Sequence, residues 1–274
     1  MNLHTKKQTY NLTTRTHIMG ILNVTPDSFS DGGAYTTIDR AVEQAKVMEN
    51  SGADMIDIGG ESTRPGHAPL SIEEEIRRVV PIIEAVCEHV QIPISIDTYK
   101  AKTAAAAIAA GADIINDVWG AKKDIDMANV AAETGVPIVL MHNRTDMNYT
   151  SLIDNMKADL EASINLAIAA GVSESQIILD PGIGFQKTGV HNLLVMNHLE
   201  EFHKLGYPLL LGASRKRFIG HILDIPEAEK RDFGTGATTC LAVTKGVQIV
   251  RVHNVQANKE LAQMTDAMIR SEGH

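Results

Sequence analysis

The sequence predicts an α/β protein, a single-domain (β/α)8 barrel of the TIM type, on three observations. One phrase recurs along the chain: a helix-like stretch, a glycine, a short connection and an apolar run that ends in a polar residue. Six copies of this phrase and two further apolar runs make eight segments, each suited to a strand buried on both faces. The length of 274 residues gives about 34 residues for each strand and its helix, which matches a barrel of roughly 250 residues.

The expected strands follow one another along the chain. The first lies in the run HIMGILNV from His17, and the second lies in the phrase that starts at Ser51. The other six lie in the run from Ile92 and in the phrases that start at Ala110, Thr134, Ala170, Leu205 and Lys245. The glycine of each phrase can end the preceding helix in a left-handed cap. Helices are expected over 37–50, 71–89, 100–110, 126–133, 151–170 and 236–245, and residues 1–16 form a short N-terminal lead-in.

A doubly wound open sheet is the alternative to the barrel, because hydrophobic periodicity does not distinguish a closed sheet from one with open edges. We favour the barrel, since eight strands in one unbroken domain suit it better. One domain is therefore expected over residues 1–274.

Composition and charge exclude several classes of protein. With 44% hydrophobic and 22% charged residues, the chain has the usage of ordinary globular proteins rather than of disordered ones. A net charge of −9 with 4% aromatic residues is unlike the basic, aromatic-interleaved surface of a nucleic-acid binder. No window reaches the roughly 20 apolar residues that span a bilayer, and the N-terminus lacks the apolar core of a secretory signal. Cys87 and Cys240 lie far apart without metal-ligand spacing, so a reduced, cytoplasmic protein is expected.

A polar residue stands at the end of every expected strand. Barrel enzymes place their chemistry at the C-terminal ends of the strands. A single polar residue there would more often be a solvated cap or a structural partner of a loop amide, but one on every strand favours a site. These residues are Asn23, Asp57, Asp97, Asn116 with Asp117, His142, Asp180, Ser214 to Lys216, and Arg251 with His253.

The peptides around these strand ends resemble those of the dihydropteroate synthase family, the pterin-binding barrels. The two longest and most specific matches are GILNVTPDSFSDGG over 20–33 and DIGGESTRPG over 57–66. Shorter matches follow in order: SIDT from Ser95, INDV from Ile115, LMH from Leu140, DPGIGF from Asp180, GASRK from Gly212 and RVH from Arg251. The resemblance covers nearly the whole chain.

The resemblance implies a transferase of folate biosynthesis. Such an enzyme condenses 6-hydroxymethyl-7,8-dihydropterin diphosphate with 4-aminobenzoate and gives 7,8-dihydropteroate and pyrophosphate. By resemblance, Asp180 and Asn116 bind the aminopyrimidinone edge of the pterin, which a buried carboxylate and an amide suit chemically. Taken alone, Asp97 before Thr98 would also fit a helix N-cap. The positions that the family pattern places around the pterin are Asp97, Asn116, Met141, Asp180, Phe185, Gly212 and Lys216.

The leaving diphosphate needs cations and oriented donors. Arg251 and His253 lie two residues apart on one strand, so their side chains share a face toward one anion, and the resemblance assigns them to the diphosphate. In the family pattern Asn23 binds Mg²⁺ that bridges the diphosphate oxygens, as oxygen ligands suit this ion. By spacing alone, Asn23 would be a turn residue before Thr25 and Pro26.

The loops after the first two strands, 27–33 and 62–66, are rich in Gly, Ser and Pro, which suits flaps that close over substrates. The alternative is an ordinary loop in which Arg64 is a solvated charge. Ser214 is expected to open a helix whose free amides accept the aminobenzoate carboxylate. By resemblance, Thr63 helps hold the diphosphate substrate, and the aminobenzoate pocket comprises Phe29, Asp31, Thr63, Arg64, Pro65, Phe185 and Ser214.

The predicted mechanism is dissociative and forms no covalent enzyme intermediate, since no Ser-His-Asp or Cys-His arrangement is evident. Mg²⁺ and the side chains of Lys216, Arg251 and His253 would stabilise the departing negative charge, with Asp97 near the developing positive charge. Asp31 completes the expected catalytic set. The family is typically a homodimer, and the segment 236–268 has the apolar content for helices that pair.

Two other functions remain open. A pterin-binding barrel without synthase chemistry would need Asn116 and Asp180 but would have no use for the residues of the flaps. An isomerase or aldolase acting on sugar phosphates would use Lys216 as a base over a carbonyl and would leave the flap sequences unexplained. The segment GIGFQKT over 182–188 also looks like a nucleotide-binding loop, but Gln186 stands where that pattern requires glycine before Lys187.

Overall fold

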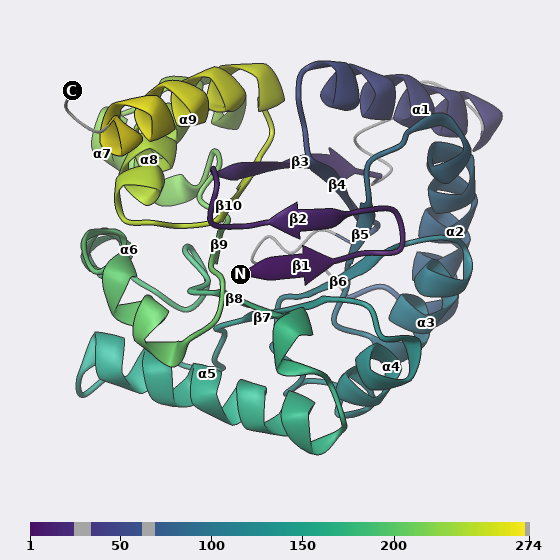
Figure 1. The fold of residues 1–274 in the computed structure, drawn as a ribbon, viewed down its shortest axis with the longest axis horizontal. Coiled ribbons are helices and arrows are strands. Elements are labelled where there is room, and N and C mark those ends of the chain that lie inside the picture. Colours follow the sequence, from purple (N-terminus) through teal and green to yellow (C-terminus); the bar gives the residue numbers. More distant parts are fainter. Residues whose placement is uncertain (25–33, 62–68, 272–274) are drawn as a thin grey trace.

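Eight parallel strands form the barrel that the sequence predicts, and the fold class is confirmed (Figure 1). The computed structural model describes residues 1–24, 34–61 and 69–271. Around the sheet the strands follow the order β8-β7-β6-β5-β4-β3-β10-β9, and a parallel bridge between Leu179 and Leu209 closes the ring. The strands are β3 (His17–Asn23), β4 (Met55–Gly59), β5 (Ile94–Asp97), β6 (Ile114–Asp117), β7 (Ile138–Met141), β8 (Ile177–Asp180), β9 (Leu210–Leu211) and β10 (Ile249–Val252).

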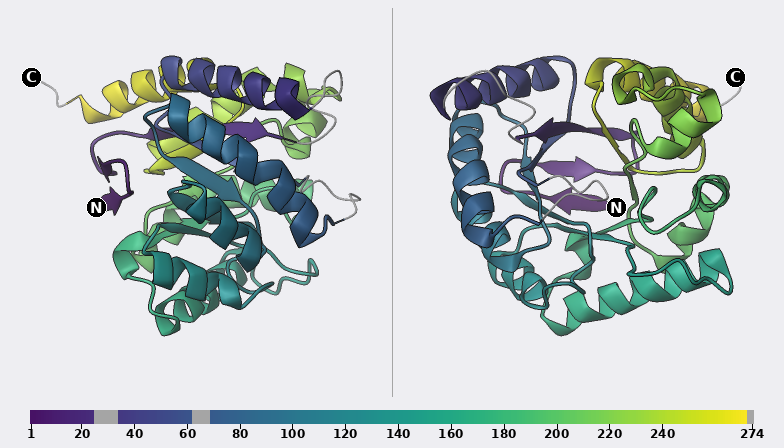
Figure 2. Two further views of the ribbon diagram at one scale, coloured as in Figure 1. Left: turned by 90° about the vertical axis from the view of Figure 1, so that its right-hand side faces the viewer. Right: turned by 180° about the vertical axis from the view of Figure 1, so that it is seen from behind.

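Helices surround the barrel (Figures 1 and 2). They are α1 (Ala34–Asn50), α2 (Ile72–His89), α3 (Ala101–Ala109), α4 (Asp126–Thr134), α5 (Leu152–Ala169), α6 (Gly189–Asn197), α7 (Arg217–Leu223), α8 (Asp232–Thr244) and α9 (Val255–Arg270). The six predicted helices agree with α1 to α5 and α8 within four residues at each end. Gly135 illustrates the recurring glycine, because it caps α4 in the left-handed conformation with φ of 67°. Across the described residues, no helix has both the length and the hydropathy to cross a membrane.

The N-terminal segment is a structural element of its own. Residues expected to be a lead-in form an antiparallel hairpin, β1 (Asn2–His4) and β2 (Thr9–Asn11), which crosses the N-terminal end of the barrel (Figure 1). The ammonium group of Lys7 donates to the carbonyl groups of Val90 and Ile92 at 3.0 and 3.1 Å, which fixes the hairpin turn. The hairpin therefore plugs the barrel on the side away from the strand ends.

Below the strand ends, the barrel interior is apolar. Three hairpin side chains form one buried cluster with inward-pointing residues of the strands: Leu3, Tyr10, Leu12, Met19, Met55, Ile114, Val139, Ile178, Leu210 and Ile249. Side chains alternate between the two faces of a strand, so the residue two positions further on points into the same interior. This next layer toward the C-terminal ends contains Asp57, Asn116, Met141, Asp180, Gly212 and Arg251. The fold thus brings residues from six strands to the floor of one site.

Candidate active site

Four polar side chains from β4, β5, β6 and β10 form one hydrogen-bonded group, which we call the Arg251 cluster: Asp57, Asp97, Asn116 and Arg251. Oδ2 of Asp57 accepts from Nδ2 of Asn116 at 2.9 Å and from Nε of Arg251 at 2.6 Å. Nη2 of Arg251 donates to Oδ2 of Asp97 at 2.8 Å. Arg251, which the sequence predicts to face the diphosphate, is thus bonded to two carboxylate groups of the protein.

Two buried carboxylate oxygens of this cluster have no hydrogen-bond partner in the part of the chain that the structure describes. They are the Oδ1 atoms of Asp57 and Asp97. Burial raises the pKa of Asp97 to about 7, and the neighbouring Asp57 also raises it, while the Arg251 guanidinium acts in the opposite direction. Buried polar atoms almost always have a partner, so these oxygens are suited to the N–H groups of a ligand.

Asp180 lies across the barrel interior at the end of β8. Its Oδ1 accepts from the backbone N–H of Gly182 at 2.7 Å. A Cβ atom on Gly212 would lie 3.5 Å from Oδ2, at ordinary van der Waals distance, so this oxygen borders Gly212. Burial raises the pKa of Asp180, although Lys216 lowers it. Met141, the last residue of β7, pairs in register with Asp180 and is buried beside it.

Lys216 and Phe185 lie on the same side as Asp180. The Lys216 ammonium group donates to the carbonyl of Ile183, and its Nζ lies 4.6 Å from the centroid of the Phe185 ring. Burial lowers the pKa of Lys216 to about 8, while Asp180 raises it. A ring of ligand size placed here would meet an aromatic face, a cation and a carboxylate.

Ser214 and His253 form a separate pair after β9 and β10. Oγ of Ser214 lies 2.9 Å from Nδ1 of His253 and accepts from the His253 backbone N–H at 3.2 Å. Arg251 therefore contacts the two carboxylates of its cluster, while His253 is engaged with Ser214. The neighbouring Arg215 is bound to Asp232 through Nε and Nη2 at 2.6 and 2.9 Å. The prediction that Ser214 opens a helix is wrong. Helix α7 begins at Arg217 with Lys216 as its N-cap, because Arg215 between Ser214 and the cap has a left-handed φ of 57°.

Of the remaining predicted site residues, the structure describes only Asn23. Asn23 is exposed at the end of β3, and it pairs in register with Gly59, which in turn pairs with Asp97. Its amide therefore faces solvent at the edge of the site. The other predicted residues lie outside the described residues, so their roles stay predictions: Phe29, Asp31, Thr63, Arg64 and Pro65.

Asp57 is the site residue to which sequence reasoning gave no role. It is fully buried and joins Arg251 to Asn116. Its position at the end of a strand, inside the motif DIGGESTRPG, was the available signal. Asp117, also at a strand end, has a structural role, because its oxygens accept from the backbone N–H groups of Trp119 and Ala121 at 2.8 and 2.6 Å.

Comparison with known proteins agrees with this geometry. The sequence model of the family described as pterin binding enzyme matches residues 19–253. The dihydropteroate synthase of Bacillus subtilis is 56% identical over 271 residues, which are 99% of this chain and 95% of that protein. A crystal structure of dihydropteroate synthase from Clostridium difficile with pteroic acid has a TM-score of 0.93 and 48% identity, covering 96% of this chain and 100% of that one. The Xanthomonas albilineans dihydropteroate synthase with 4-aminobenzoic acid has a TM-score of 0.94 and 39% identity, covering 99% of both chains.

Proposed function

The chain belongs to the family of pterin-binding enzymes and is a dihydropteroate synthase, and from this premise we propose how its residues divide the reaction. The reaction joins 4-aminobenzoate to the methylene carbon of 6-hydroxymethyl-7,8-dihydropterin diphosphate and releases pyrophosphate. The observation that supports our assignment best is the pair of buried acceptors in the Arg251 cluster that have no partner among the described residues. Asp180 lies in the same layer of the barrel interior as this cluster. This arrangement suits a flat heterocycle with several N–H donors.

Asp180, Asn116 and the Arg251 cluster bind the pterin ring in this proposal. Asp180 offers Oδ2 to ring N–H groups, and Asn116 is fixed by its bond to Asp57 at 2.9 Å, which leaves its amide oxygen as an acceptor. Phe185 and Lys216 cover the ring. Because these side chains are already held by neighbours before a ligand arrives, little ordering entropy is lost on binding.

Arg251 and His253 bind the departing diphosphate. The bonds of Arg251 to Asp57 and Asp97 use two of the five N–H groups of its guanidinium, so three remain for phosphate oxygens. Loss of diphosphate precedes attack by the aniline nitrogen and leaves a cation delocalised into the dihydropterin ring. The ionised carboxylate of Asp97 stabilises that cation, and no side chain becomes covalently attached.

The residues present fit a magnesium ion that is shared with the substrate. Asn23 places an amide oxygen at the exposed end of β3, which suits an ion that takes one or two protein ligands and completes its shell with water and phosphate oxygens. Over residues 1–24, 34–61 and 69–271, no group of three His, Cys, Asp or Glu side chains could hold a metal by itself. Asn23 would hold the ion, which when bound neutralises negative charge on the diphosphate.

The experiment that tests this function is a pyrophosphate release assay with the purified protein. Multiple-turnover release is expected only when the pterin diphosphate, 4-aminobenzoate and Mg²⁺ are all present, and it should stop when EDTA removes the metal. Tight pterin binding without release would favour the binding protein described above. Release that continues unchanged in EDTA would contradict the role of the metal.

Asp97 should give the reaction a rising pH dependence. Because burial raises its pKa to about 7, Asp97 is protonated below neutral pH and gains the charge that stabilises the cation only above it. We expect kcat/KM for the pterin diphosphate to increase as the pH rises through about 7. Asp97→Asn should remove this rise and lower the rate at high pH. If kcat/KM of Asp97→Asn still increased with pH, the titrating group would be a residue other than Asp97.

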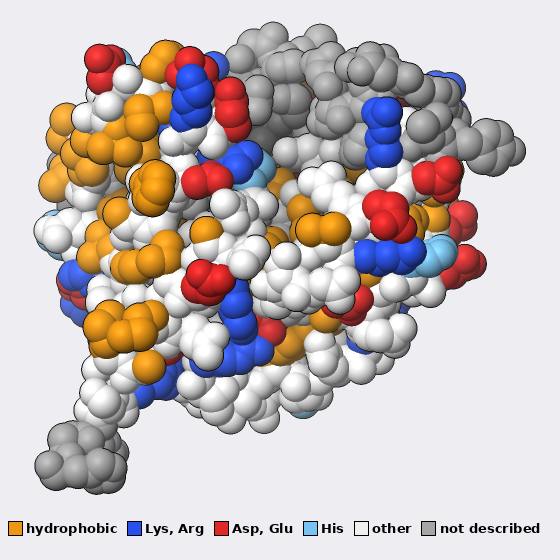
Figure 3. Space-filling view, turned by 90° about the horizontal axis from the view of Figure 1, so that it is seen from above, with side chains coloured by type: hydrophobic (Ala, Val, Ile, Leu, Met, Phe, Trp, Pro, Cys, Tyr) orange, Lys and Arg blue, Asp and Glu red, His pale blue; other side chains and the backbone are white. Residues whose placement is uncertain are grey.

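We further propose that the protein is a homodimer that pairs through α7, α8 and α9. Figure 3 shows hydrophobic side chains gathered on this side of the molecule. Phe233, the second residue of α8, is 96% exposed, which is unusual for an aromatic side chain. Sedimentation equilibrium that returned only the monomer mass would exclude the pairing. The other exposed apolar residues of these helices are Ile222, Leu223, Leu261, Met264, Met268 and Ile269.

A cytoplasmic location is part of the same proposal. Cys87 and Cys240 are free thiols, which suits a reducing compartment. Fractionation of the native cells with the activity as marker would test it.

A further inference from the structure

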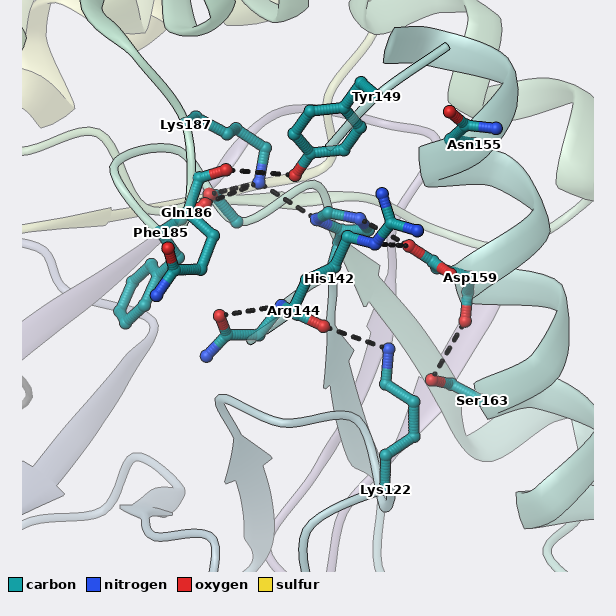
Figure 4. Close-up of polar contacts among 12 residues, drawn as sticks. Lys122, His142, Arg144, Tyr149, Asn155, Asp159, Ser163, Phe185, Gln186 and Lys187 are labelled. Carbon is teal, nitrogen blue, oxygen red and sulfur yellow. Dashed lines mark hydrogen bonds and ion pairs between the residues drawn. The ribbon is translucent and has the colours of Figure 1, made fainter. Parts of the chain in front are cut away.

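Lys187 is a buried lysine for which the reaction described above has no use. It is 8% exposed and lies behind the loop 181–186, which follows Asp180 (Figure 4). Its Nζ donates to the carbonyls of Gly182 and Phe185 at 2.9 and 3.0 Å, and it lies 2.9 Å from Nδ1 of His142. An ammonium group has three protons, so these three acceptors use all of them.

His142 is held so that it can accept this bond. It is completely buried, and its Nε2 lies 3.1 Å from Oδ2 of Asp159. Because Nδ1 faces an ammonium donor, the ring proton must be on Nε2, which then donates to Asp159. Burial, and next to it the charge of Lys187, lowers the pKa of His142 to about 2, so the ring stays neutral. Arg144 in turn holds Asp159 through its Nε at 3.1 Å (Figure 4).

The loop 181–186 needs such support because its backbone is unusual. Gly182, Gly184 and Gln186 have φ values of 67°, 84° and 43°. A Cβ atom on Gly182 would lie 2.0 Å from the carbonyl oxygen of His142, so the loop packs directly on the end of β7. The left-handed conformation of Gln186 is strained, because this residue has a side chain. Such a conformation persists only where surrounding contacts enforce it.

The same loop determines three features of the pterin site. The N–H of Gly182 orients Oδ1 of Asp180 at 2.7 Å, and the carbonyl of Ile183 accepts from Lys216. Phe185 supplies the ring that lies 4.6 Å from the Lys216 ammonium group. A change in the carbonyl directions at Gly182 and Phe185 would therefore move groups on which pterin binding depends.

We propose that Lys187 is a positioning residue for the pterin ring, acting through the three bonds that hold the loop 181–186 against His142. This inference rests on the proposed function of Asp180, Phe185 and Lys216. The inference also assigns an indirect role in substrate binding to His142 and Asp159. His142 provides the third acceptor for Lys187, and Asp159 orients the His142 ring. None of these three residues needs to touch the substrate.

Lys187→Met tests the proposal, because methionine keeps most of the aliphatic chain and removes all three donors. Affinity should be measured by calorimetry for two separate probes, 6-hydroxymethylpterin and inorganic pyrophosphate with Mg²⁺. We expect the pterin dissociation constant to rise about tenfold or more, equivalent to at least one hydrogen bond, with the pyrophosphate constant changing less than about twofold. A merely structural role would lower the melting temperature and leave both constants of the folded fraction unchanged.

Lys122→Met is the matched control. Lys122 lies in the same group of residues and donates to the carbonyl of Asn143 at 3.1 Å, away from the loop 181–186 (Figure 4). The variant Lys122→Met should therefore bind 6-hydroxymethylpterin with the affinity of the wild-type protein. His142→Asn keeps an acceptor near the position of Nδ1 and should weaken pterin binding less than His142→Leu.

Two outcomes would overturn the proposal. One is a pterin dissociation constant of Lys187→Met within about twofold of the wild-type value, and the other is an equal loss of affinity for pterin and pyrophosphate. Failure of the synthase assignment is seen separately, as absence of pyrophosphate release by the wild-type protein with both substrates.

Discussion

Asp180→Asn is expected to raise the KM for the pterin diphosphate by about 10- to 100-fold. The substitution preserves shape, and its amide oxygen can still accept from the Gly182 N–H that Asp180 binds at 2.7 Å. The second oxygen of Asp180, which faces Gly212, is replaced by an NH2 group that opposes the N–H donors of the ring. A hydrogen bond to a charged group contributes about 1.5 to 3 kcal/mol, which sets the size of the expected loss. Steady-state kinetics at saturating 4-aminobenzoate measures it.

Asp117→Asn is the matched control for this variant. Asp117 is another buried carboxylate at a strand end, on β6, but its oxygens accept from the backbone N–H groups of Trp119 and Ala121. Its replacement should lower the melting temperature and leave the KM for the pterin diphosphate near the wild-type value. An equal rise in KM for Asp117→Asn and Asp180→Asn would mean that general damage to the barrel, rather than ring recognition, explains the first result.

Most of the fold could be predicted because its signals are local. A glycine cap, an apolar run and a polar end are all contained within a few residues, and they recur around the whole barrel. The hairpin of β1 and β2 was missed because its strands have three residues each, too few for a periodic pattern. Its apolar residues Leu3, Tyr10 and Leu12 acquire a meaning only once the barrel end that they cover is present.

The sequence predicted which residues form the site better than it predicted the contacts between them. Sequence reasoning brought Asp97, Asn116, Asp180 and Arg251 to one face, since all are at the ends of parallel strands. It could not show that Arg251 is bonded to Asp57 and Asp97, because those partners lie 194 and 154 residues away along the chain. The cation that was expected to attract an anion is thus already part of an acidic cluster.

The contact between Lys187 and His142 could not be predicted from the sequence either. In the sequence, Lys187 stands in a segment that looks like a nucleotide-binding loop, and His142 is a polar residue at the end of a strand. Their bond at 2.9 Å joins residues 45 positions apart. Burial of a lysine is rare without partners, but the sequence does not indicate that a lysine is buried.

Arg251→Met is expected to lower the free energy of unfolding by about 3 to 5 kcal/mol, the usual cost of removing one partner from a buried ion pair. Asp57, which is fully buried, and Asp97 would then face each other without a cation. Because the pKa of Asp97 is already raised to about 7 in the folded protein, its ionisation destabilises the fold as the pH rises from about 4 to 7. The loss in Arg251→Met should therefore be larger at neutral than at acidic pH, and urea unfolding at both pH values measures it.

The double variant Asp57→Asn, Arg251→Met separates the two roles of this arginine. Removing one carboxylate relieves the repulsion that Arg251→Met creates, so part of the lost stability should return. Turnover should not return, because the remaining N–H groups of the guanidinium are the donors that we assign to the departing diphosphate. If pyrophosphate release recovered together with stability, Arg251 would act only as the counter-ion of Asp57 and Asp97. Asp57→Asn alone is the control, because Asp57 also holds Asn116. Recovery of stability alone, with turnover retained in Asp57→Asn, would place the guanidinium in the reaction itself.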